Sequence, residues 1–118
     1  MGCGTVFSVS PKTGAEKVIY SFLGGTDGKD PDANLLDLNG TLYGTTYNGG
    51  GDRSCEFGCG TVFSVNPKTG TETVFHSFGR GRDGTKPSAG LIDVNGMLYS
   101  TTEEGGAYGG GTVFSIAP

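Results

Sequence analysis

The sequence predicts an all-β fold of two tandem four-stranded antiparallel repeats plus a ninth strand, arranged as blades of a β-propeller. The segment Gly-Thr-Val-Phe-Ser occurs three times, starting at Gly4, Gly60 and Gly111. Between Gly2 and Gly50, 31 of 49 residues are identical to the residue 56 positions later. Repeats of this length are typical of solenoids, propellers and arrays. No segment has helical periodicity over ten residues, which excludes a long amphipathic helix.

The first repeat contains four short segments rich in β-branched and aromatic residues, which favour strands. The segment Pro-Lys-Thr-Gly at 11–14 predicts a turn, because proline presets φ and glycine permits a left-handed residue. Asn39 and Gly40 are a strong hairpin signal, since both residues tolerate positive φ. The expected strands are Thr5–Val9, Lys17–Phe22, Leu35–Leu38 and Thr41–Thr46.

The second repeat carries the same turns and strand-forming segments in the same order. Residues 1–57 are therefore predicted to form the first blade, residues 58–110 the second, and residues 111–118 the first strand of a third. The expected strands are Thr61–Val65, Thr73–Phe78, Leu91–Val94 and Met97–Thr102, followed by the lone ninth strand Thr112–Ile116.

The strands indicate sheets that are covered on both faces. Leu35–Leu38, for example, does not alternate cleanly between polar and apolar residues. A blade of a propeller is covered in this way by its two neighbours. A two-sheet sandwich explains the strands equally well, but it does not explain the 56-residue identity.

A longer motif runs through both repeats. In the first repeat it consists of Gly-Thr-Val-Phe at 4–7, Asp-Gly-x-x-Pro-x-Ala-x-Leu at 27–35, Asn-Gly-x-Leu-Tyr-x-Thr-Thr at 39–46 and Gly-Gly at 49–50. This pattern resembles the GloVer tandem repeat of bacterial exported proteins and covers nearly the whole chain. The resemblance implies a propeller-like fold in long secreted or surface-anchored proteins with many repeats, and it implies no catalytic site.

Two repeats bury little core alone, and repeat folds generally need at least three units. We therefore expect self-assembly, either as a ring of three or four chains or as an open head-to-tail filament. In a ring, Thr112–Ile116 of one chain competes with Thr5–Val9 of the next for one position. Alternatively, the ninth strand closes the last blade of the chain. A second function, carbohydrate binding by a propeller lectin formed on oligomerisation, stays open at this point.

The three cysteines predict one disulfide. Cys55 and Cys59 lie four residues apart in a glycine-rich loop that is able to bring them within bonding distance. Cys3 occupies the position of Cys59 in its repeat, so it is left without a partner. A disulfide indicates an oxidising compartment, and with the family resemblance it suggests an extracellular or cell-surface location. Free thiols and a metal site are the alternatives, although the cysteines lack zinc-finger spacing.

Three carboxylates in one loop suggest a candidate calcium site, with Asp27, Asp30 and Asp32 as ligands. In the second repeat, Lys86 stands for Asp30 and Ser88 for Asp32, so that loop does not offer the same ligands. The aspartate at position 27 recurs, which favours a role in capping the turn. No other cofactor is indicated.

The remaining candidates are one histidine and two tyrosines. His76 is the only histidine, and Tyr20 takes its place in the first repeat, which favours a structural role. A catalytic base also needs a nucleophile or acid beside it, so we expect no enzyme activity. Tyr47 and Tyr108 lie at loop edges and are the candidate platforms for a glycan.

Charge and hydropathy argue against two classes of partner. The formal net charge is −4, with eight Lys and Arg against twelve Asp and Glu, whereas nucleic-acid binding needs a basic face. Arg80 and Arg82 are only a small local cluster. No apolar run is long enough to cross a membrane, so the expected partners are copies of the chain, neighbouring repeats or a glycan.

Overall fold

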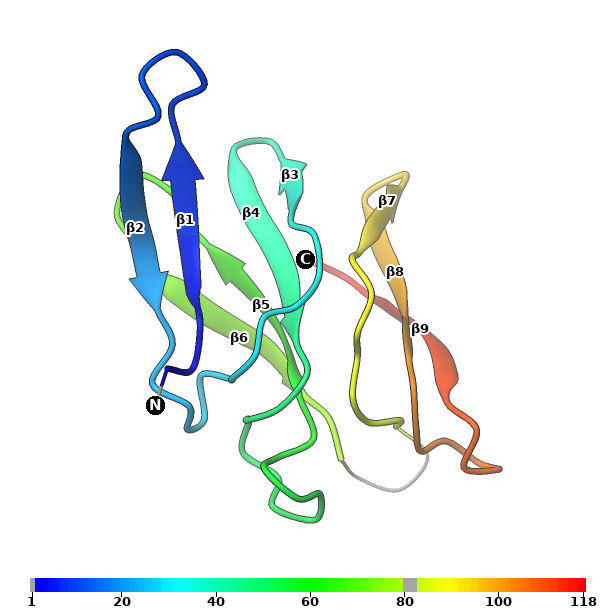
Figure 1. The fold of residues 1–118 in the computed structure, drawn as a ribbon. Coiled ribbons are helices and arrows are strands. Elements are labelled where there is room, and N and C mark those ends of the chain that lie inside the picture. The colour runs from blue at the N-terminus through cyan, green and yellow to red at the C-terminus, as the bar shows by residue number, and fades with distance from the viewer. Residues whose placement is uncertain (1, 80–82) are drawn as a thin grey trace.

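A computed structural model describes residues 2–79 and 83–118, and every regular element in these ranges is a β-strand (Figure 1). No helix in the described part is long and apolar enough to span a membrane. The nine strands are β1 (Thr5–Val9), β2 (Glu16–Ser21), β3 (Leu36–Leu38), β4 (Thr41–Thr46), β5 (Thr61–Val65), β6 (Glu72–Ser77), β7 (Ile92–Val94), β8 (Met97–Thr102) and β9 (Thr112–Ile116).

The nine predicted strands are present, and their ends differ from the expected ones by at most one residue. Both hairpins of the type β3–β4 turn at Asn-Gly, where Asn39 and Gly40 have φ values of 55° and 87°. Such paired positive values belong to the two-residue turn that matches the twist of antiparallel strands. The side chain of Asp37 accepts a hydrogen bond from the Gly40 amide at 2.9 Å and fixes the turn.

The strands do not group as the repeats do, which corrects the prediction that each repeat forms its own four-stranded sheet. The chain forms three antiparallel sheets with the orders β1–β2, β3–β4–β5–β6 and β7–β8–β9. The complete sheet takes two strands from each repeat, because β4 continues through the 47–60 loop into β5 and pairs with it from Leu42–Val65 to Thr46–Thr61. The segment 22–35 instead carries the chain to the next sheet.

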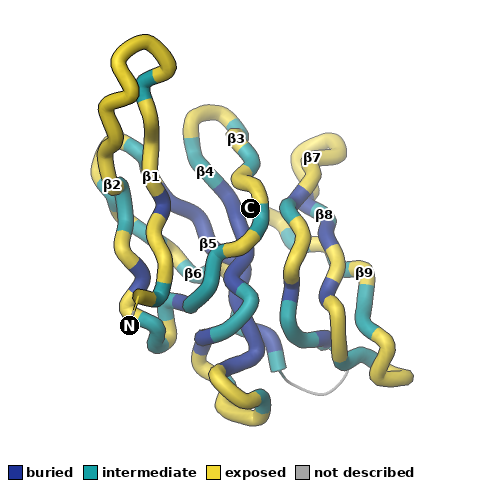
Figure 2. Tube along the Cα trace, in the orientation of Figure 1, coloured by how far each residue is buried: buried dark blue, intermediate teal, exposed yellow. Residues whose placement is uncertain are grey.

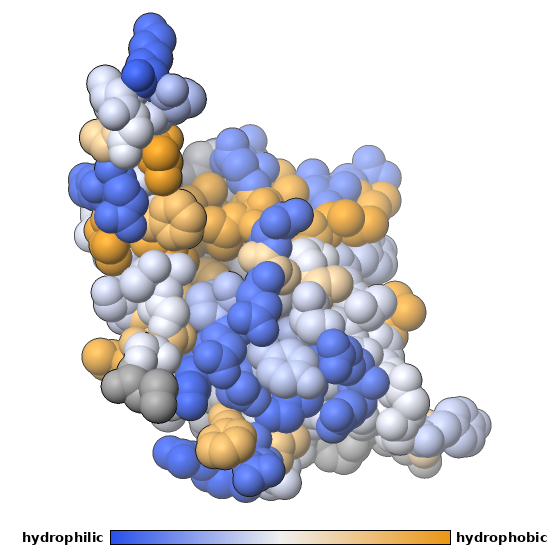
Figure 3. All heavy atoms as spheres, in the orientation of Figure 1, coloured by the Kyte–Doolittle hydropathy of each residue, from blue (hydrophilic) through white to orange (hydrophobic). Residues whose placement is uncertain are grey.

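The three sheets lie side by side as an open fan and do not close into a ring (Figure 1). The hairpin turns gather at one end, and the long 22–35 and 47–60 loops lie at the other, which we call the loop end. On the face drawn in Figure 3, hydrophobic groups form a band across the upper part, whereas mostly hydrophilic groups cover the loop end.

The hydrophobic core lies between successive sheets. One cluster is formed by Val6, Phe22, Phe63 and Val65. In it the rings of Phe22 and Phe63 pack edge to face, with their centres 5.1 Å apart. A second cluster lies between the middle and last sheets and repeats this contact as Phe78 against Phe114 at 5.1 Å. Its buried members are Tyr43, Cys59, Val62, Phe78, Leu91 and Leu98.

Neighbouring sheets decide how deeply each copy of the repeated strand is buried (Figure 2). All five residues of β5 are buried, because Val62 faces one cluster and Phe63 and Val65 face the other. In β1, which has the same sequence, Phe7 is 55% exposed, and in β9 Val113 is 79% exposed. Both outer sheets therefore lack the cover that the middle sheet has.

Candidate functional site

The site with the densest polar contacts lies at the loop end, where the second repeat meets the first. Lys86 reaches from the segment before β7 into the 47–60 loop. Its ammonium donates to the Asn48 side-chain oxygen and to the carbonyls of Glu56 and Gly58 at 2.9 and 2.8 Å. The same ammonium lies 5.2 Å from the centre of the Tyr47 ring, a cation–π contact. We call these groups the ammonium cage.

The backbone holds Lys86 in place. Its amide donates to the Cys59 carbonyl at 2.8 Å, and its carbonyl accepts from the Glu103 amide at 3.0 Å. The residue has a φ of 63°, in the left-handed region. Burial lowers the pKa of Lys86, while the carboxylates of Glu104, Glu56 and Asp30 oppose this change. The cage therefore contains a cation that is partly removed from water and held by oxygen atoms.

Of the two candidate tyrosines, the structure places only Tyr47 in this cage. Its hydroxyl donates to the Glu103 carboxylate at 3.0 Å, and this hydrogen bond is the main cause of the raised pKa of Tyr47. One face of its ring is taken by the Lys86 ammonium. Tyr108 is 99% exposed. The Tyr47 ring therefore contacts groups of the second repeat, whereas the Tyr108 ring faces solvent.

The structure does not bring the three candidate calcium ligands together. Asp27 accepts hydrogen bonds from the Tyr20 hydroxyl at 2.7 Å, the Leu23 amide at 2.8 Å and the Gly25 amide at 3.2 Å. Asp30 accepts from the Asn48 side chain at 2.6 Å, and Asp32 is exposed. Among the described residues, no group of three Asp, Glu, His or Cys side chains is placed to hold a metal ion. Asp27 has the turn-capping role that its recurrence suggested.

A disulfide joins Cys55 to Cys59, as the sequence predicts. Cys59 is fully buried in the second core cluster, so the bond anchors the 47–60 loop to the core. Cys3 is a free, partly exposed thiol in the matching position of the first repeat. The same loop supplies the carbonyls of the ammonium cage, which means that the disulfide also braces that site.

His76 is placed as a structural residue. Its Nε2 lies 2.6 Å from the Asp83 carboxylate, and the Tyr20 hydroxyl makes the matching contact with Asp27 in the first repeat. The Ser77 hydroxyl accepts a hydrogen bond from the Gly51 amide at 3.3 Å. These contacts fasten loops to strands in both repeats. Burial and the bond to Asp27 raise the pKa of Tyr20.

Glu72 is the most perturbed carboxyl group in the described part of the chain. Burial, followed by the nearby Asp27 carboxylate, raises its pKa to about 7 from an ordinary value of 4.5. Its Oε2 atom is buried and has no hydrogen-bond partner among the described residues. Because this pKa differs from that of the unfolded chain, Glu72 makes the stability of the fold depend on pH.

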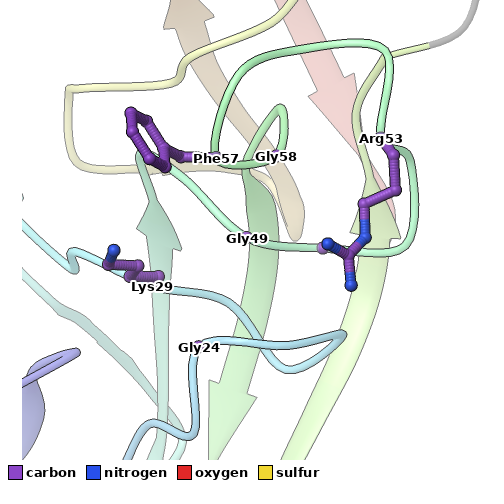
Figure 4. Close-up of a pocket in the computed structure, with 7 residues that line it drawn as sticks. Gly24, Lys29, Gly49, Arg53, Phe57 and Gly58 are labelled. Carbon is purple, nitrogen blue, oxygen red and sulfur yellow. The ribbon is translucent and has the colours of Figure 1, made fainter.

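A small recess of about 160 Å³ is lined in part by Gly58, which also belongs to the cage. Figure 4 shows the residues that line this recess. Lys29 reaches it from the 22–35 loop, and Phe57 and Arg53 from the 47–60 loop, with glycine backbone between them. The Lys29 ammonium lies 5.4 Å from the centre of the Phe57 ring. Within residues 2–79 and 83–118, neither cation has a carboxylate ion-pair partner. The recess therefore suits an anionic group beside a ring.

The sequence identified Lys86 only as a substitution for Asp30 and missed its role in the cage. Its partners come from a loop 28 to 38 residues earlier, so no local spacing marks them. The available signal is that four residues around the cage differ between the two repeats. Asp30, Tyr47 and Asn48 of the first repeat are replaced by Lys86, Glu103 and Glu104 in the second, and Lys29 is replaced by Thr85. Arg80 and Arg82 lie outside the described residues.

Together, the repeated strands, the side-by-side sheets and the bonds between repeats define an all-β tandem-repeat protein. The family model of the Gloeobacter/Verrucomicrobia repeat matches residues 1–118, and the chain belongs to that family. This match agrees with the motif resemblance seen in the sequence. No curated protein and no solved structure matches the chain.

Proposed function

We propose that the chain is a structural and interaction module of an exported bacterial protein, whose outer sheets are completed by further repeats. In this proposal the sheets are blades of a propeller-like array, and repeats join side by side into a ring or a filament. The partners are neighbouring repeats or other copies of the chain. The disulfide is consistent with an extracellular or cell-surface location.

One observation carries this proposal: the strand Thr-Val-Phe-Ser-Val is fully buried as β5 but largely exposed as β1. The β1–β2 sheet lacks the two strands that precede β5 in the complete sheet, and the β7–β8–β9 sheet lacks the strand that follows. A groove of about 230 Å³ runs beside β1, lined by Thr5, Phe7, Leu35 and Phe63 among others. Exposed strand edges of this kind pair readily with other strands.

Light scattering on a size-exclusion column over a wide range of protein concentrations tests the proposal. The measurements are made at high ionic strength, because salt screens the charges on the protein surface. We expect the average mass to rise with concentration, and Phe7→Asp to prevent the rise because Phe7 lines the β1 groove. Leu23→Asp is the matched control, since Leu23 is equally apolar and 84% exposed. A monomer at every concentration, or assembly unaffected by Phe7→Asp, contradicts the proposal.

A second candidate function is binding of a carboxylated saccharide at the recess of Figure 4. The support is the juxtaposition of two cations and the Phe57 ring, which is 67% exposed. An aromatic ring packs on the apolar face of a sugar, while Arg and Lys bind its carboxylate. Lys29 and Arg53 have no counterparts in the second repeat, so this recess belongs to the first repeat alone.

Calorimetric titration with an oligogalacturonate tests this candidate. We expect binding that weakens in salt and is lost in the Lys29→Gln, Arg53→Gln double variant. Lys12→Gln, Lys68→Gln is the matched control, because it removes two positive charges from exposed turns at the opposite end of the strands. Equal binding of a neutral oligosaccharide, or no binding at all, rules the candidate out.

A further inference from the structure

Position 86 of the second repeat and position 30 of the first play the same backbone role with opposite charge. The Lys86 amide donates to the Cys59 carbonyl, and the Asp30 amide donates to the Cys3 carbonyl at 2.9 Å. The φ values match as well, at 63° and 61°. Lys86 stands where the second repeat meets the loop of the first, and Asp30 holds the corresponding backbone position in the first repeat. Among the described residues this first meeting point of two repeats is occupied by a cation.

The last sheet offers the next meeting point with a different set of side chains. Glu103 takes the place of Tyr47, and Glu104 takes the place of Asn48, which is confirmed by the matching bridges Lys29–Asn48 and Thr85–Glu104. Both glutamates are exposed.

One backbone turn of the cage loop recurs there, in a shorter loop. The Gly109 amide donates to the Gly106 carbonyl at 3.3 Å, as the Gly58 amide donates to the Cys55 carbonyl at 3.0 Å. The C-terminal cage, defined by Glu103, Glu104 and Gly109, thus combines two carboxylates with a carbonyl.

From these two meeting points we infer that the C-terminal cage accepts a following repeat that carries a lysine at the position of Lys86, and disfavours a second copy of this chain. A second copy presents Asp30 at that point, with its carboxylate bonded to its own Asn48 side chain at 2.6 Å, and so adds a third negative charge to the region of Glu103 and Glu104. Like charges set directly opposite each other act as a strong selection against the wrong partner. The inference rests on the proposed side-by-side assembly and adds the identity of the partner.

Strand pairing itself does not prevent a copy from docking. In the middle sheet Tyr43 of β4 pairs with Ser64 of β5, and in the last sheet Tyr99 of β8 pairs with Ser115 of β9. An incoming β1 differs from β9 only by Val for Ile at the last residue, so it fits the same register. It also brings β2 as a further paired strand. Exchange of β9 for an incoming β1 therefore keeps the number of strand pairings and adds β2 to the sheet, so the charges at the cage decide the outcome.

The last sheet exposes apolar groups on which a further segment is able to pack. A shallow recess of about 220 Å³ is lined mainly by apolar groups of Ile92, Tyr99, Thr101 and Val113. In the middle sheet, Thr45 at the position of Thr101 donates to the Ala89 carbonyl of the following segment at 3.2 Å. The cover expected over the last sheet is the equivalent segment of a following repeat.

The test compares the full-length wild type with Asp30→Lys by sedimentation equilibrium at low and high ionic strength. We expect Asp30→Lys to associate at least about tenfold more tightly than the wild type at low salt. Salt is expected to weaken association of the variant and to strengthen association of the wild type, because screening removes an attraction in one case and a repulsion in the other. Glu16→Lys is the matched control, since it makes the same charge change at the opposite end of the β1–β2 hairpin.

The outcomes separate the two proposals. Equal association of wild type and Asp30→Lys, abolished in both by Phe7→Asp, overturns the charge selection and leaves side-by-side assembly intact. Association of Asp30→Lys that persists with Phe7→Asp, or no association of any variant, overturns both. A gain in Glu16→Lys equal to that in Asp30→Lys assigns the effect to net charge and also overturns the selection.

Discussion

Replacing Glu72 by glutamine is expected to stabilise the protein at alkaline pH and to leave it unchanged at acid pH. The folded protein binds the Glu72 proton more tightly than the unfolded chain does, since the pKa of Glu72 rises from 4.5 to about 7 on folding. Stability from this group is therefore fully present below pH 4.5 and is lost as the pH rises to 7. Above that range the buried carboxylate is ionised beside Asp27, and glutamine removes that cost.

The magnitude follows from the change in pKa. A difference of about 2.5 units corresponds to at most about 3.4 kcal/mol at about 1.36 kcal/mol per unit. Because Glu72 is only partly buried, solvent screening reduces this to about 1–2 kcal/mol. For a chain of this size the midpoint of thermal unfolding then rises by about 4–8 °C at pH 8.5.

Thermal unfolding followed by circular dichroism at pH 4 and pH 8.5 measures the effect. Glu16→Gln is the matched control, because Glu16 occupies the same position in the first repeat and is exposed. The reasoning fails if Glu72→Gln raises the midpoint equally at both pH values. It also fails if Glu16→Gln has the same effect.

Three further changes test the packing and the cage. Gly44→Ala should destabilise the fold by about 2–3 kcal/mol in urea unfolding, because the new Cβ lies 2.8 Å from the buried Phe63 ring. Lys86→Met should cost about 1–2 kcal/mol and speed amide exchange in the 47–60 loop, because it leaves the cage oxygens without their donor. Cys55→Ser should cost about 2 kcal/mol, since the disulfide closes a short loop.

Each of these changes has a control in the other repeat. Ser100 occupies the position of Gly44, and Ser100→Ala should cost less than Gly44→Ala, because that site already holds a Cβ. Lys12→Met removes an exposed lysine from the turn after β1 and should not affect exchange in the 47–60 loop as Lys86→Met does. Cys3→Ser should behave like the wild type under oxidising and reducing conditions alike. If a control variant changes the measured property as much as its test variant does, the contact proposed for that test variant is refuted.

The sequence predicted the strands and turns because their signals are local. Asn39-Gly40 and its copy carry the backbone preference of a hairpin within two residues, and the β-branched segments carry the preference for strands. The Cys55–Cys59 disulfide was also predictable, since four residues of a flexible loop decide it. The role of Asp27 as a turn cap followed from its presence in both repeats.

The candidate site was less accessible to sequence reasoning. The loop-edge position of Tyr47 predicts a glycan platform, whereas its ring and hydroxyl contact Lys86 and Glu103 from the next repeat. Closeness in sequence groups Asp30 with Asp32, but Asp30 accepts a hydrogen bond from Asn48 whereas Asp32 is exposed. A contact between residues 30 or more positions apart depends on how the sheets stack, which no local pattern encodes.

The amino-acid sequence by itself determined where this protein forms strands and turns, that it is a tandem repeat, and which cysteines bond. Only the tertiary structure decided which strands share a sheet, since β4 pairs across the repeat boundary with β5 rather than staying within its repeat. It also decided that one copy of Thr-Val-Phe-Ser-Val is core and another is edge. The physical reason is that burial is a property of the neighbours a strand acquires, and identical strands acquire different neighbours at the middle and at the ends of a stack.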